Sequence, residues 1–404
     1  MKFGLFYEFQ MPRPWLPDSE YRLYQDGLTQ IELADRLGYD CAWQVEHHFL
    51  EEYAHSPTPE MFLSAASQRT KNIRLGHGIM QLTTSPPARV AERIATLDLL
   101  SGGRVEFGTG ESASITELEP FGITMENKRA VWEDGLRAVI PMFRDGGCEY
   151  DGRYFKMPYR NVLPKPLQKP HPPLWVACAQ LETIEMAGRW GLGALGFQFL
   201  NAEAAHAWVH AYYNSFTKRM EKLADYQTNP NIAIVSYFMC AQTDEEAQRR
   251  AEGATFFQFA LAFYGNAPGR RRPRAGTVNM WEEFETWRRE NPENVQRSMQ
   301  GALIGSPETL RRQLLKFQSS NIDQVILLFQ AGKNSHQHIC ESLELFAKEV
   351  MPEFHAAEPD HHEWKRKVLA GEIELEEIDT TAFKERYGPE SVRVAPTEKN
   401  VVTA

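Results

Sequence analysis

The sequence predicts an α/β fold, a (β/α)8 TIM barrel with insertions and a C-terminal extension. Short apolar runs alternate with helix-like segments eight times from residue 2 to residue 351, which is the pattern of a barrel of parallel strands. Polar residues and glycines follow several of these runs, where such a barrel carries its functional groups. A doubly wound open sheet would need a Gly-x-Gly-x-x-Gly turn after the first strand, and residues 7–11 contain none.

The first four strand–helix units occupy the first third of the chain. Apolar runs predict strands at residues 2–7, 41–45, 73–80 and 104–108. Helical spacing of apolar residues predicts helices at residues 19–37, 58–69, 86–100 and 127–143. Asp18 or Ser19 can cap the first helix, and Gly38 can end it.

The last four units complete the barrel. Strands are predicted at residues 174–177, 194–197, 232–240 and 324–329. Helices are predicted at residues 183–190, 202–224, 306–317 and 338–350, with one more helix capped by Asp244. Ser306 followed by Pro307 is a strong helix start, and Pro352 ends the closing helix.

Three segments do not fit the repeating pattern. Residues 146–167 are rich in tyrosine and proline and predict an excursion with a small hairpin. Residues 265–299 are polar, contain four arginines between positions 270 and 274, and predict an insertion in the form of a solvated loop or a lid. Residues 355–404 form the predicted C-terminal extension, with one helix at 364–373, either packed on the outside or disordered, so the barrel domain spans 1–354.

Composition excludes several classes of function. The net charge of −10 argues against nucleic acid as a partner, because phosphate binding needs a basic surface. The five cysteines have no Cys-x-x-Cys spacing, and Cys41, Cys178 and Cys240 lie in apolar runs, which indicates buried free thiols in a reducing compartment. No apolar run approaches the roughly 18 residues of a membrane helix, so we expect a cytoplasmic protein with no membrane partner.

The most informative motif is Glu46-His47-His48, directly after the second predicted strand. The end of a strand in a barrel of parallel strands is where catalytic side chains gather. An imidazole titrates near neutral pH and suits acid–base chemistry. Taken alone, two histidines after a strand also fit an ordinary polar loop.

The ordered set of motifs resembles the bacterial luciferase family of flavin-dependent monooxygenases, from residue 1 to about residue 354. Six segments carry the resemblance, at residues 1–6, 43–49, 99–108, 121–130, 305–308 and 349–352. Each segment is moderately specific, and their order along the chain makes the set strong.

The resemblance implies a two-component monooxygenase. Such an enzyme binds reduced FMN (FMNH2), which a separate flavin reductase supplies, and uses O2 through a flavin peroxide to oxygenate a small, largely apolar organic substrate. His47 would be the acid–base group near the peroxide, and Glu46 and His48 would support it. Family members are often dimers, so a homodimer is expected.

The resemblance also implies cofactor contacts. Gly78, Ile79 and Gly110 match positions that line the isoalloxazine ring, although barrel packing explains each equally well. Arg129 matches a phosphate-binding arginine. The turn from the fifth strand into its helix could hold the phosphate through backbone amides and a hydroxyl, and it consists of Cys178, Ala179, Gln180 and, after two more residues, Thr183.

Glu111 departs from the luciferase pattern, since that enzyme places a second arginine there. A carboxylate beside a phosphate would repel it. Three explanations are open. Glu111 points away from the phosphate, or Lys128 or an arginine of residues 265–299 binds the phosphate in place of the missing arginine, or the flavin site is altered. The same barrel leaves two other functions open, an F420-dependent oxidoreductase that transfers hydride and a non-catalytic flavin-binding protein.

Two further residue sets were weighed. Aromatic residues near strand ends fit either an apolar substrate pocket or the barrel core, and they are Phe6, Tyr7, Phe9, Phe197, Tyr237 and Phe329. A metal-dependent hydrolase fits poorly, because residues 361–363 (His-His-Glu) lie in the extension and no second His/Asp cluster has ligand spacing. No metal is therefore expected.

Overall fold

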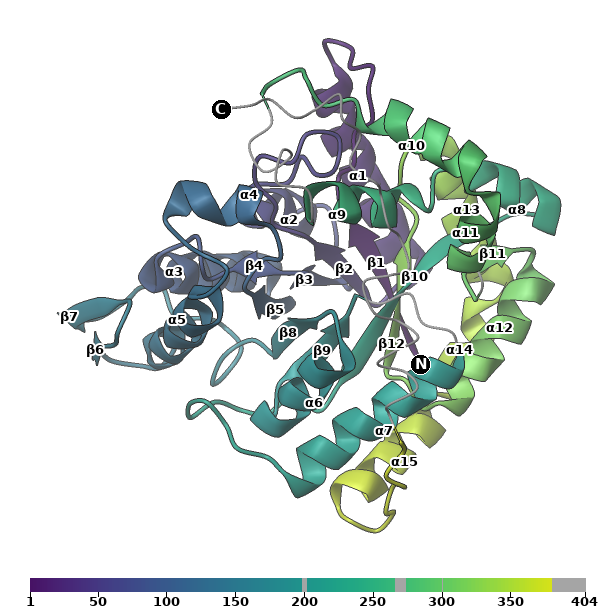
Figure 1. The fold of residues 1–404 in the computed structure, drawn as a ribbon. Coiled ribbons are helices and arrows are strands. Elements are labelled where there is room, and N and C mark those ends of the chain that lie inside the picture. The colour runs from purple at the N-terminus through teal and green to yellow at the C-terminus, as the bar shows by residue number, and fades with distance from the viewer. Residues whose placement is uncertain (198–201, 266–273, 300, 380–404) are drawn as a thin grey trace.

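The computed structural model describes residues 1–197, 202–265, 274–299 and 301–379. Within these residues, eight parallel strands close into a barrel, as predicted (Figure 1). The barrel closes where Lys2 pairs with Gln324 and where Ala194 pairs with Ile232. In order around the barrel the strands are β1 (Lys2–Tyr7), β2 (Cys41–Gln44), β3 (Arg74–His77), β5 (Val105–Gly110), β8 (Leu174–Cys178), β9 (Gly193–Gly196), β10 (Ile232–Cys240) and β12 (Gln324–Leu328).

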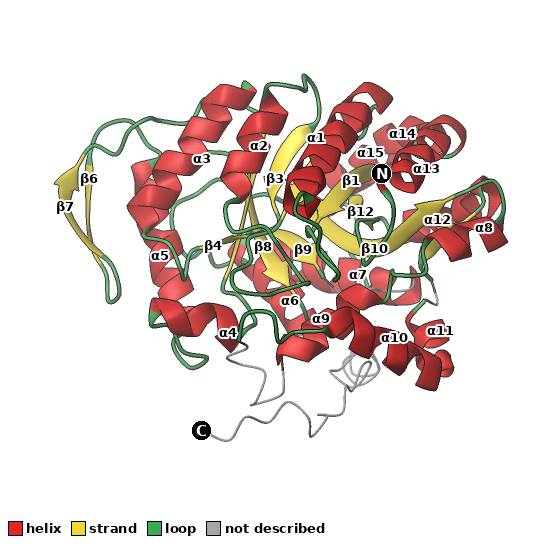
Figure 2. Ribbon diagram, turned by 90° about the horizontal axis from the view of Figure 1, so that it is seen from above, coloured by secondary structure: helices red, strands yellow, loops and turns green. Residues whose placement is uncertain are grey.

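Helices surround the strands, as Figure 2 shows from above. The predicted helices are present as α1 (Ser19–Leu37), α2 (Pro59–Ser67), α3 (Pro87–Ser101), α5 (Lys128–Met142), α6 (Leu181–Trp190), α7 (Ala202–Lys218), α8 (Asp244–Arg250), α12 (Pro307–Ser319) and α13 (His336–Glu349). Gly38 ends α1 at a φ of 87°, a left-handed conformation that favours glycine. The Ser306 side chain accepts from the backbone of Thr309 and so caps α12 as predicted. The helix predicted to reach residue 224 ends at Lys218.

Trp43 fills the inside of the barrel near its centre. Its indole Nε1 donates to Gln324 Oε1 at 3.0 Å, and its ring lies edge-on to Trp175 at 5.4 Å. A Cβ at Gly76 would lie 2.3 Å from the Trp43 ring. The absence of a side chain at residue 76 therefore makes room for this indole in a barrel interior that is packed solid.

The predicted third strand, residues 73–80, is interrupted in the structure. It consists of β3 and a separate short strand, β4 (Met80–Gln81), and the peptide bond between Gly78 and Ile79 is cis. β3 pairs with the lower part of β5, whereas β4 pairs with its upper end. The sequence pattern did not reveal the interruption, because Ile73, Leu75, Ile79 and Met80 read as one apolar run.

Gly108 on β5 lies against this interruption, and the fold depends on its missing side chain. A Cβ there would lie 1.9 Å from the carbonyl oxygen of His77, and a backbone atom cannot move aside. We expect Gly108→Ala to lower the free energy of unfolding by about 1–3 kcal/mol or more, as overpacking does. Urea denaturation followed by circular dichroism measures this loss.

Gly135→Ala on α5 is the matched control for Gly108→Ala. The nearest atom to a Cβ at Gly135 is 3.6 Å away, an ordinary contact. Alanine favours a helix over glycine by about 1 kcal/mol, so this variant should be at least as stable as the parent. Equal stability of the Gly108→Ala variant would contradict the close approach of the two strands.

The predicted hairpin in residues 146–167 is confirmed. It consists of β6 (Cys148–Asp151) and β7 (Lys156–Arg160), which pair antiparallel. Asp134 on α5 holds its turn, since the carboxylate accepts from the backbone N–H groups of Tyr154 at 2.8 Å and Phe155 at 3.0 Å.

Asp244 was wrongly predicted as a helix cap. Thr243 caps α8 instead, because its side chain accepts from the backbone of Glu246 at 3.2 Å. Asp244 is the first helical residue, and its carboxylate accepts from the backbone of Ser306 at 2.7 Å and from the hydroxyl of Thr309 at 2.9 Å. It therefore ties α8 to the start of α12.

The segment predicted as an insertion contains two helices, α10 (Met280–Glu290) and α11 (Pro292–Ser298), where the sequence favoured a solvated loop. Phe284 of α10 packs on α9 (Phe256–Gly265), with its ring 5.3 Å from Phe256. Three of the four arginines noted there, at positions 270–272, lie outside the described residues. The hydrophobic face of α10 was missed because its other faces are strongly charged.

Two helices lead into the C-terminal extension, α14 (Met351–Ala356), which spans the predicted boundary at residue 354, and α15 (Glu358–Leu369). The second starts earlier than the predicted helix at 364–373 and lies beside α7 (Figure 1). Trp364 packs edge-on against Tyr213 at 5.4 Å. This part of the extension is therefore packed on the barrel, one of the two states expected from the sequence.

Three properties follow from the described part of the chain. None of its helices is both long enough and apolar enough to cross a membrane. It contains no group of three or more His, Cys, Asp or Glu residues placed to hold a metal ion. All five cysteines are free thiols, and Cys41, Cys178 and Cys240 are buried as predicted.

Candidate active site

A cavity of about 410 Å³ opens at the C-terminal ends of the barrel strands. Its size falls in the range of small-molecule sites. Many of the residues that line it are apolar or have small side chains. It is lined by Phe6, Glu8, Val45, Glu46, His47, Tyr53, Gly78, Ile79, Gln81, Gly110, Glu111, Ser112, Ala113, Lys128, Arg129, Trp132, Val176, Ala177, Ala179, Thr183, Met186, Phe197, Phe257 and Leu261.

Most residues that the sequence singled out border this cavity. They are Glu46, His47, Gly78, Ile79, Gly110, Arg129, Ala179 and Thr183. His48, Cys178 and Gln180 do not line it. Of the strand-end aromatics, Phe6 and Phe197 face the cavity, whereas Tyr7, Phe9 and Phe329 pack together between the strands and α2.

His47 lies between two buried carboxylates. Its Nδ1 is 2.9 Å from Glu117 Oε1, and its Nε2 is 3.2 Å from Glu8 Oε1. The side chain of His47 is 22% exposed and those of both glutamates are 1% exposed. Burial by itself lowers the pKa of His47, but the charges of Glu117 and Glu8 outweigh it and raise this pKa to about 9. The two carboxylates therefore favour the imidazolium form of His47 at neutral pH.

Glu117 holds His47 from a short helix, α4 (Ile115–Leu118), that the sequence did not predict. Its carboxylate also accepts from the backbone of His48 at 3.0 Å, from Gln81 Nε2 at 3.0 Å and from the Ser112 hydroxyl at 2.7 Å. Burial raises the pKa of Glu117, but His47 and these hydrogen bonds bring it below its usual value. Glu117 is thus a fixed negative charge.

Glu46 pairs with His48. The expected support of His47 by Glu46 through a direct contact is not seen. Glu46 Oε1 lies 3.0 Å from His48 Nε2, and Glu46 Oε2 accepts from the backbone of Gln81 at 3.0 Å. Alternate side chains of an extended segment point to opposite sides. Residues 46 and 48 therefore share one side, and His47 points to the other, toward Glu8 and Glu117.

Another part of the cavity wall is basic. It carries Lys128 and Arg129 together with one carboxylate, Glu111. Arg129 Nη2 lies 2.6 Å from Glu111 Oε1, and Lys128 Nζ lies 4.0 Å from Glu111 Oε2. Lys128 also donates to the backbone carbonyl of Ser112 at 2.7 Å. Two cations and one anion leave a net positive charge, and Glu111 turns toward Arg129.

The start of α6 forms the wall next to this basic end. Gln180 is its N-cap, and the Thr183 hydroxyl donates to the Gln180 carbonyl at 2.6 Å. The hydroxyl that we expected to face a phosphate is therefore engaged in capping. Cys178 ends β8 with its buried thiol 3.2 Å from the Thr183 carbonyl oxygen, on the helix side of the strand and not in the cavity.

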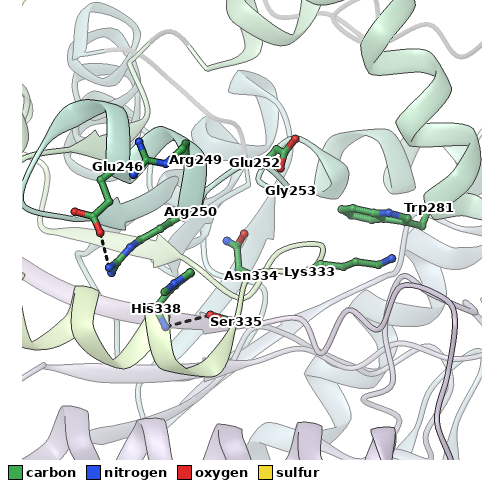
Figure 3. A pocket seen from close by; sticks show the side chains of 10 residues that line it. All are labelled: Glu246, Arg249, Arg250, Glu252, Gly253, Trp281, Lys333, Asn334, Ser335 and His338. Carbon is green, nitrogen blue, oxygen red and sulfur yellow. Dashed lines mark hydrogen bonds and ion pairs between the residues drawn. The ribbon is translucent and has the colours of Figure 1, made fainter.

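A second cavity of about 410 Å³ lies between α8 and the start of α13 (Figure 3), and none of the residues discussed so far for the first cavity lines it. Arg250, which lines it, is paired with Glu246 at 2.6 Å and with Glu341 at 2.7 Å. Lys333 extends over the Trp281 ring at 4.8 Å. The cavity at the strand ends, which combines an imidazole between two buried carboxylates with apolar walls, is therefore the candidate active site.

Sequence reasoning missed Glu8, Gln81 and Glu117. Glu8 directly follows the first strand, so its position at a strand end was a usable signal. Glu117 lies in a connecting segment without a pattern, and only its spatial position reveals its role.

Comparison with known proteins places these features in a family. The family model described as luciferase-like monooxygenase matches residues 1–324. The chain is similar to the oxygenase component of a flavin-dependent trigonelline monooxygenase from Acinetobacter baylyi, with 26% identity over 89% of this chain and 97% of that protein. It is also similar to the uncharacterized protein y4wF of Sinorhizobium fredii, with 38% identity, over 42% of this chain and only about half (49%) of that protein.

Solved structures share the fold. Monooxygenase RslO1 from Streptomyces bottropensis matches with a TM-score of 0.71 and 25% identity, over 88% of this chain and 100% of that chain. The F420-dependent tetrahydromethanopterin reductase of Methanopyrus kandleri matches with a TM-score of 0.63 and 18% identity, over 87% of this chain and 99% of that chain. The similarity to the reductase shows only that the two proteins share a fold.

Proposed function

The chain belongs to the luciferase-like monooxygenase family and is a flavin-dependent monooxygenase, and from this premise we propose that it uses reduced FMN and O2 to oxygenate a small, largely apolar organic molecule. A separate flavin reductase would supply the reduced FMN, as the name of the trigonelline relative's oxygenase component suggests. A homodimer is part of the same proposal.

The cavity fits the cofactor in two respects. Lys128 and Arg129 supply cations for a phosphate at one end, next to the start of α6. Gly78, Gly110 and Ala177 leave the middle of the cavity free of large side chains, as a flat ring system needs. When bound there, reduced FMN would supply the electrons that activate O2.

The remaining chemistry belongs to the protein. His47 holds a proton on the cavity wall, and the fixed charge of Glu117 orients the ring. Phe6, Phe197 and Phe257 give the cavity an apolar wall for a substrate and for the exclusion of water.

The observation that carries the proposal is the imidazole of His47 on the cavity wall, held between the buried carboxylates of Glu8 and Glu117. The test mixes the protein anaerobically with reduced FMN, measures binding by ultrafiltration, admits O2 and analyses a panel of small apolar molecules for oxygenated products by mass spectrometry. Tight binding of reduced FMN and an O2-dependent product are expected. Preferential binding of reduced F420 with hydride transfer and no oxygenation would replace the proposal, and binding without any product would indicate a flavin-binding protein.

Arg129 is expected to hold the flavin phosphate. Arg129→Ala should weaken binding of reduced FMN about 10- to 100-fold, because a hydrogen bond to a charged group contributes about 1.5–3 kcal/mol. Riboflavin, which has no phosphate, should bind both proteins equally. Anaerobic fluorescence titration with the two flavins measures the difference.

Two further variants sharpen the test of the phosphate end. Glu111→Gln removes the carboxylate that pairs with Arg129 and should tighten FMN binding, the opposite effect to that of Arg129→Ala. Arg137→Ala on the same helix removes an exposed arginine that bonds the Leu223 carbonyl and should change nothing. Equal losses for FMN and riboflavin in the Arg129→Ala protein would show that Arg129 does not contact the phosphate.

A further inference from the structure

Both ring nitrogens of His47 lie beside a carboxylate. Nδ1 faces Glu117 and Nε2 faces Glu8, at 2.9 Å and 3.2 Å. A proton on either nitrogen therefore has a carboxylate oxygen next to it that could take it up.

Glu117 is unsuited to that task. Three donors besides His47 already bond its two oxygens, namely the backbone of His48, Gln81 Nε2 and the Ser112 hydroxyl. It does not line the cavity. Its pKa lies below the usual value, so it keeps no proton to pass on near neutral pH.

Glu8 has the opposite properties. It lines the cavity, directly after β1, and its side chain is only 1% exposed. Among the described residues, Oε1 makes the charge contact with His47 but no hydrogen bond of good geometry. The Tyr53 hydroxyl bonds the same carboxyl group. Glu8 therefore connects Nε2 of His47 with the space in which reactants bind.

We propose that Glu8 is a further catalytic residue, whose carboxyl group passes protons between Nε2 of His47 and the reactants in the cavity. This inference rests on the proposed function. Monooxygenation places one oxygen atom of O2 in the product and releases the other as water, so protons must reach an oxygen atom in the cavity.

The transfer is balanced in two steps. The Glu8 carboxylate takes the Nε2 proton of the imidazolium, which leaves a neutral His47 still bonded to Glu117 and a neutral Glu8 carboxyl group. That carboxyl group then gives its proton to an oxygen in the cavity and returns to the carboxylate. Glu8 then takes up a proton from water and passes it to Nε2, which restores the imidazolium form of His47.

The acid–base properties of the two groups suit this exchange. Burial, together with the charge of Glu117, raises the pKa of Glu8 to about 7 against the opposing effects of His47 and the Tyr53 hydrogen bond. The pKa of His47 is raised to about 9 by Glu117, Glu8 and, more weakly, Glu46, against burial. A proton carrier works best when its pKa lies near the working pH. Tyr53 is the other titratable group that faces Glu8.

The first experiment needs no flavin. Nitrogen-15-labelled histidine NMR measures how fast the Nε2 and Nδ1 protons of His47 exchange with water in the parent protein and in Glu8→Gln. The relay predicts at least tenfold slower exchange at Nε2 in the variant and no change at Nδ1. Unchanged or faster exchange at Nε2 would overturn the proposal, since loss of a merely charge-balancing carboxylate opens the ring to water.

The second experiment adds reduced FMN and measures, by stopped flow across pH, the reaction of the protein-bound cofactor with O2. Glu8→Gln should slow it at least tenfold at every pH, and Glu8→Asp should restore part of the rate. A rate that recovers fully at lower pH would mean that Glu8 only tunes the pKa of His47, and would also overturn the proposal. If the parent protein does not alter the reaction at all, the proposed function fails, while the exchange experiment still decides whether Glu8 carries protons.

Glu20→Gln is the matched control for both experiments. Glu20, exposed on α1, forms a similar pair with His55, at 2.9 Å, and neither residue lines the cavity. This variant should leave the exchange of the His47 protons and the reaction with O2 unchanged.

Discussion

Replacement of His47 by asparagine is expected to lower the rate of oxygenation about 10²- to 10⁴-fold, the range that general acid–base catalysis contributes. Asparagine keeps a polar side chain between Glu8 and Glu117 but carries no exchangeable charge. Binding of reduced FMN should change little, because its phosphate is expected at Lys128 and Arg129 and not at His47. Product formation with excess reduced FMN, compared with anaerobic FMN binding, separates the two effects.

The same variant should change the dependence of activity on pH. The pKa of His47 is raised from 6.5 to about 9 in the folded protein, so the imidazolium persists through the neutral range. Activity that needs its proton should fall as the pH rises through about 9, and this limb should vanish in His47→Asn. The ion pairs of His47 with Glu117 and Glu8 also add to the free energy of unfolding. This contribution is complete below pH 6.5 and is lost as the pH rises through about 9.

His338→Asn is the control for His47→Asn. His338 lines the second cavity, at the start of α13, and its replacement should leave oxygenation unchanged. Full activity of the His47→Asn protein would remove His47 from the mechanism. The contacts of His47 with Glu8 and Glu117 would then be a structural feature.

Replacement of Asp323 by alanine is expected to lower the free energy of unfolding by about 3–5 kcal/mol, the usual effect of removing one partner from a buried ion pair. Asp323 lies before β12, at the opposite end of the barrel from the cavity. Its carboxylate is 2.9 Å from Lys365 Nζ and 2.7 Å from His361 Nε2, both on α15, and it accepts from the Tyr213 hydroxyl at 2.7 Å. The change would leave these three groups without their shared acceptor.

Asp323 should also make stability depend on pH. Burial raises its pKa, but Lys365 and His361 outweigh burial and hold the pKa well below the usual value of 3.8. The stabilisation is therefore present above pH 3.8 and is lost as the pH falls below it. Urea denaturation at neutral and acidic pH measures both effects.

Asp360→Ala provides the control for Asp323→Ala, since Asp360 is exposed on the same helix, α15. It should change the free energy of unfolding by no more than about 0.5 kcal/mol. If Asp323→Ala were equally mild, α15 would not depend on this ion pair for its position.

The sequence by itself determined the barrel and the place of its chemistry. Eight alternations of strand and helix leave few other architectures, because a parallel sheet must be covered on both faces. It also placed His47 at a strand end, and it identified Arg129 and Glu111 at one site, although not their ion pair. These features depend on local patterns, which a sequence carries directly.

Only the tertiary structure decided which groups surround His47. The pairing of Tyr7 with Gln44 sets the register of β1 and β2, and this register places Glu8 beside the segment that carries His47. Glu117 reaches the same imidazole from 70 residues away along the chain, on a short helix without a periodic pattern. The neighbouring Glu46 turns to the other side, since the extended backbone alternates its side chains. The charge state of His47 thus depends on contacts between distant segments, and local sequence patterns do not specify such contacts.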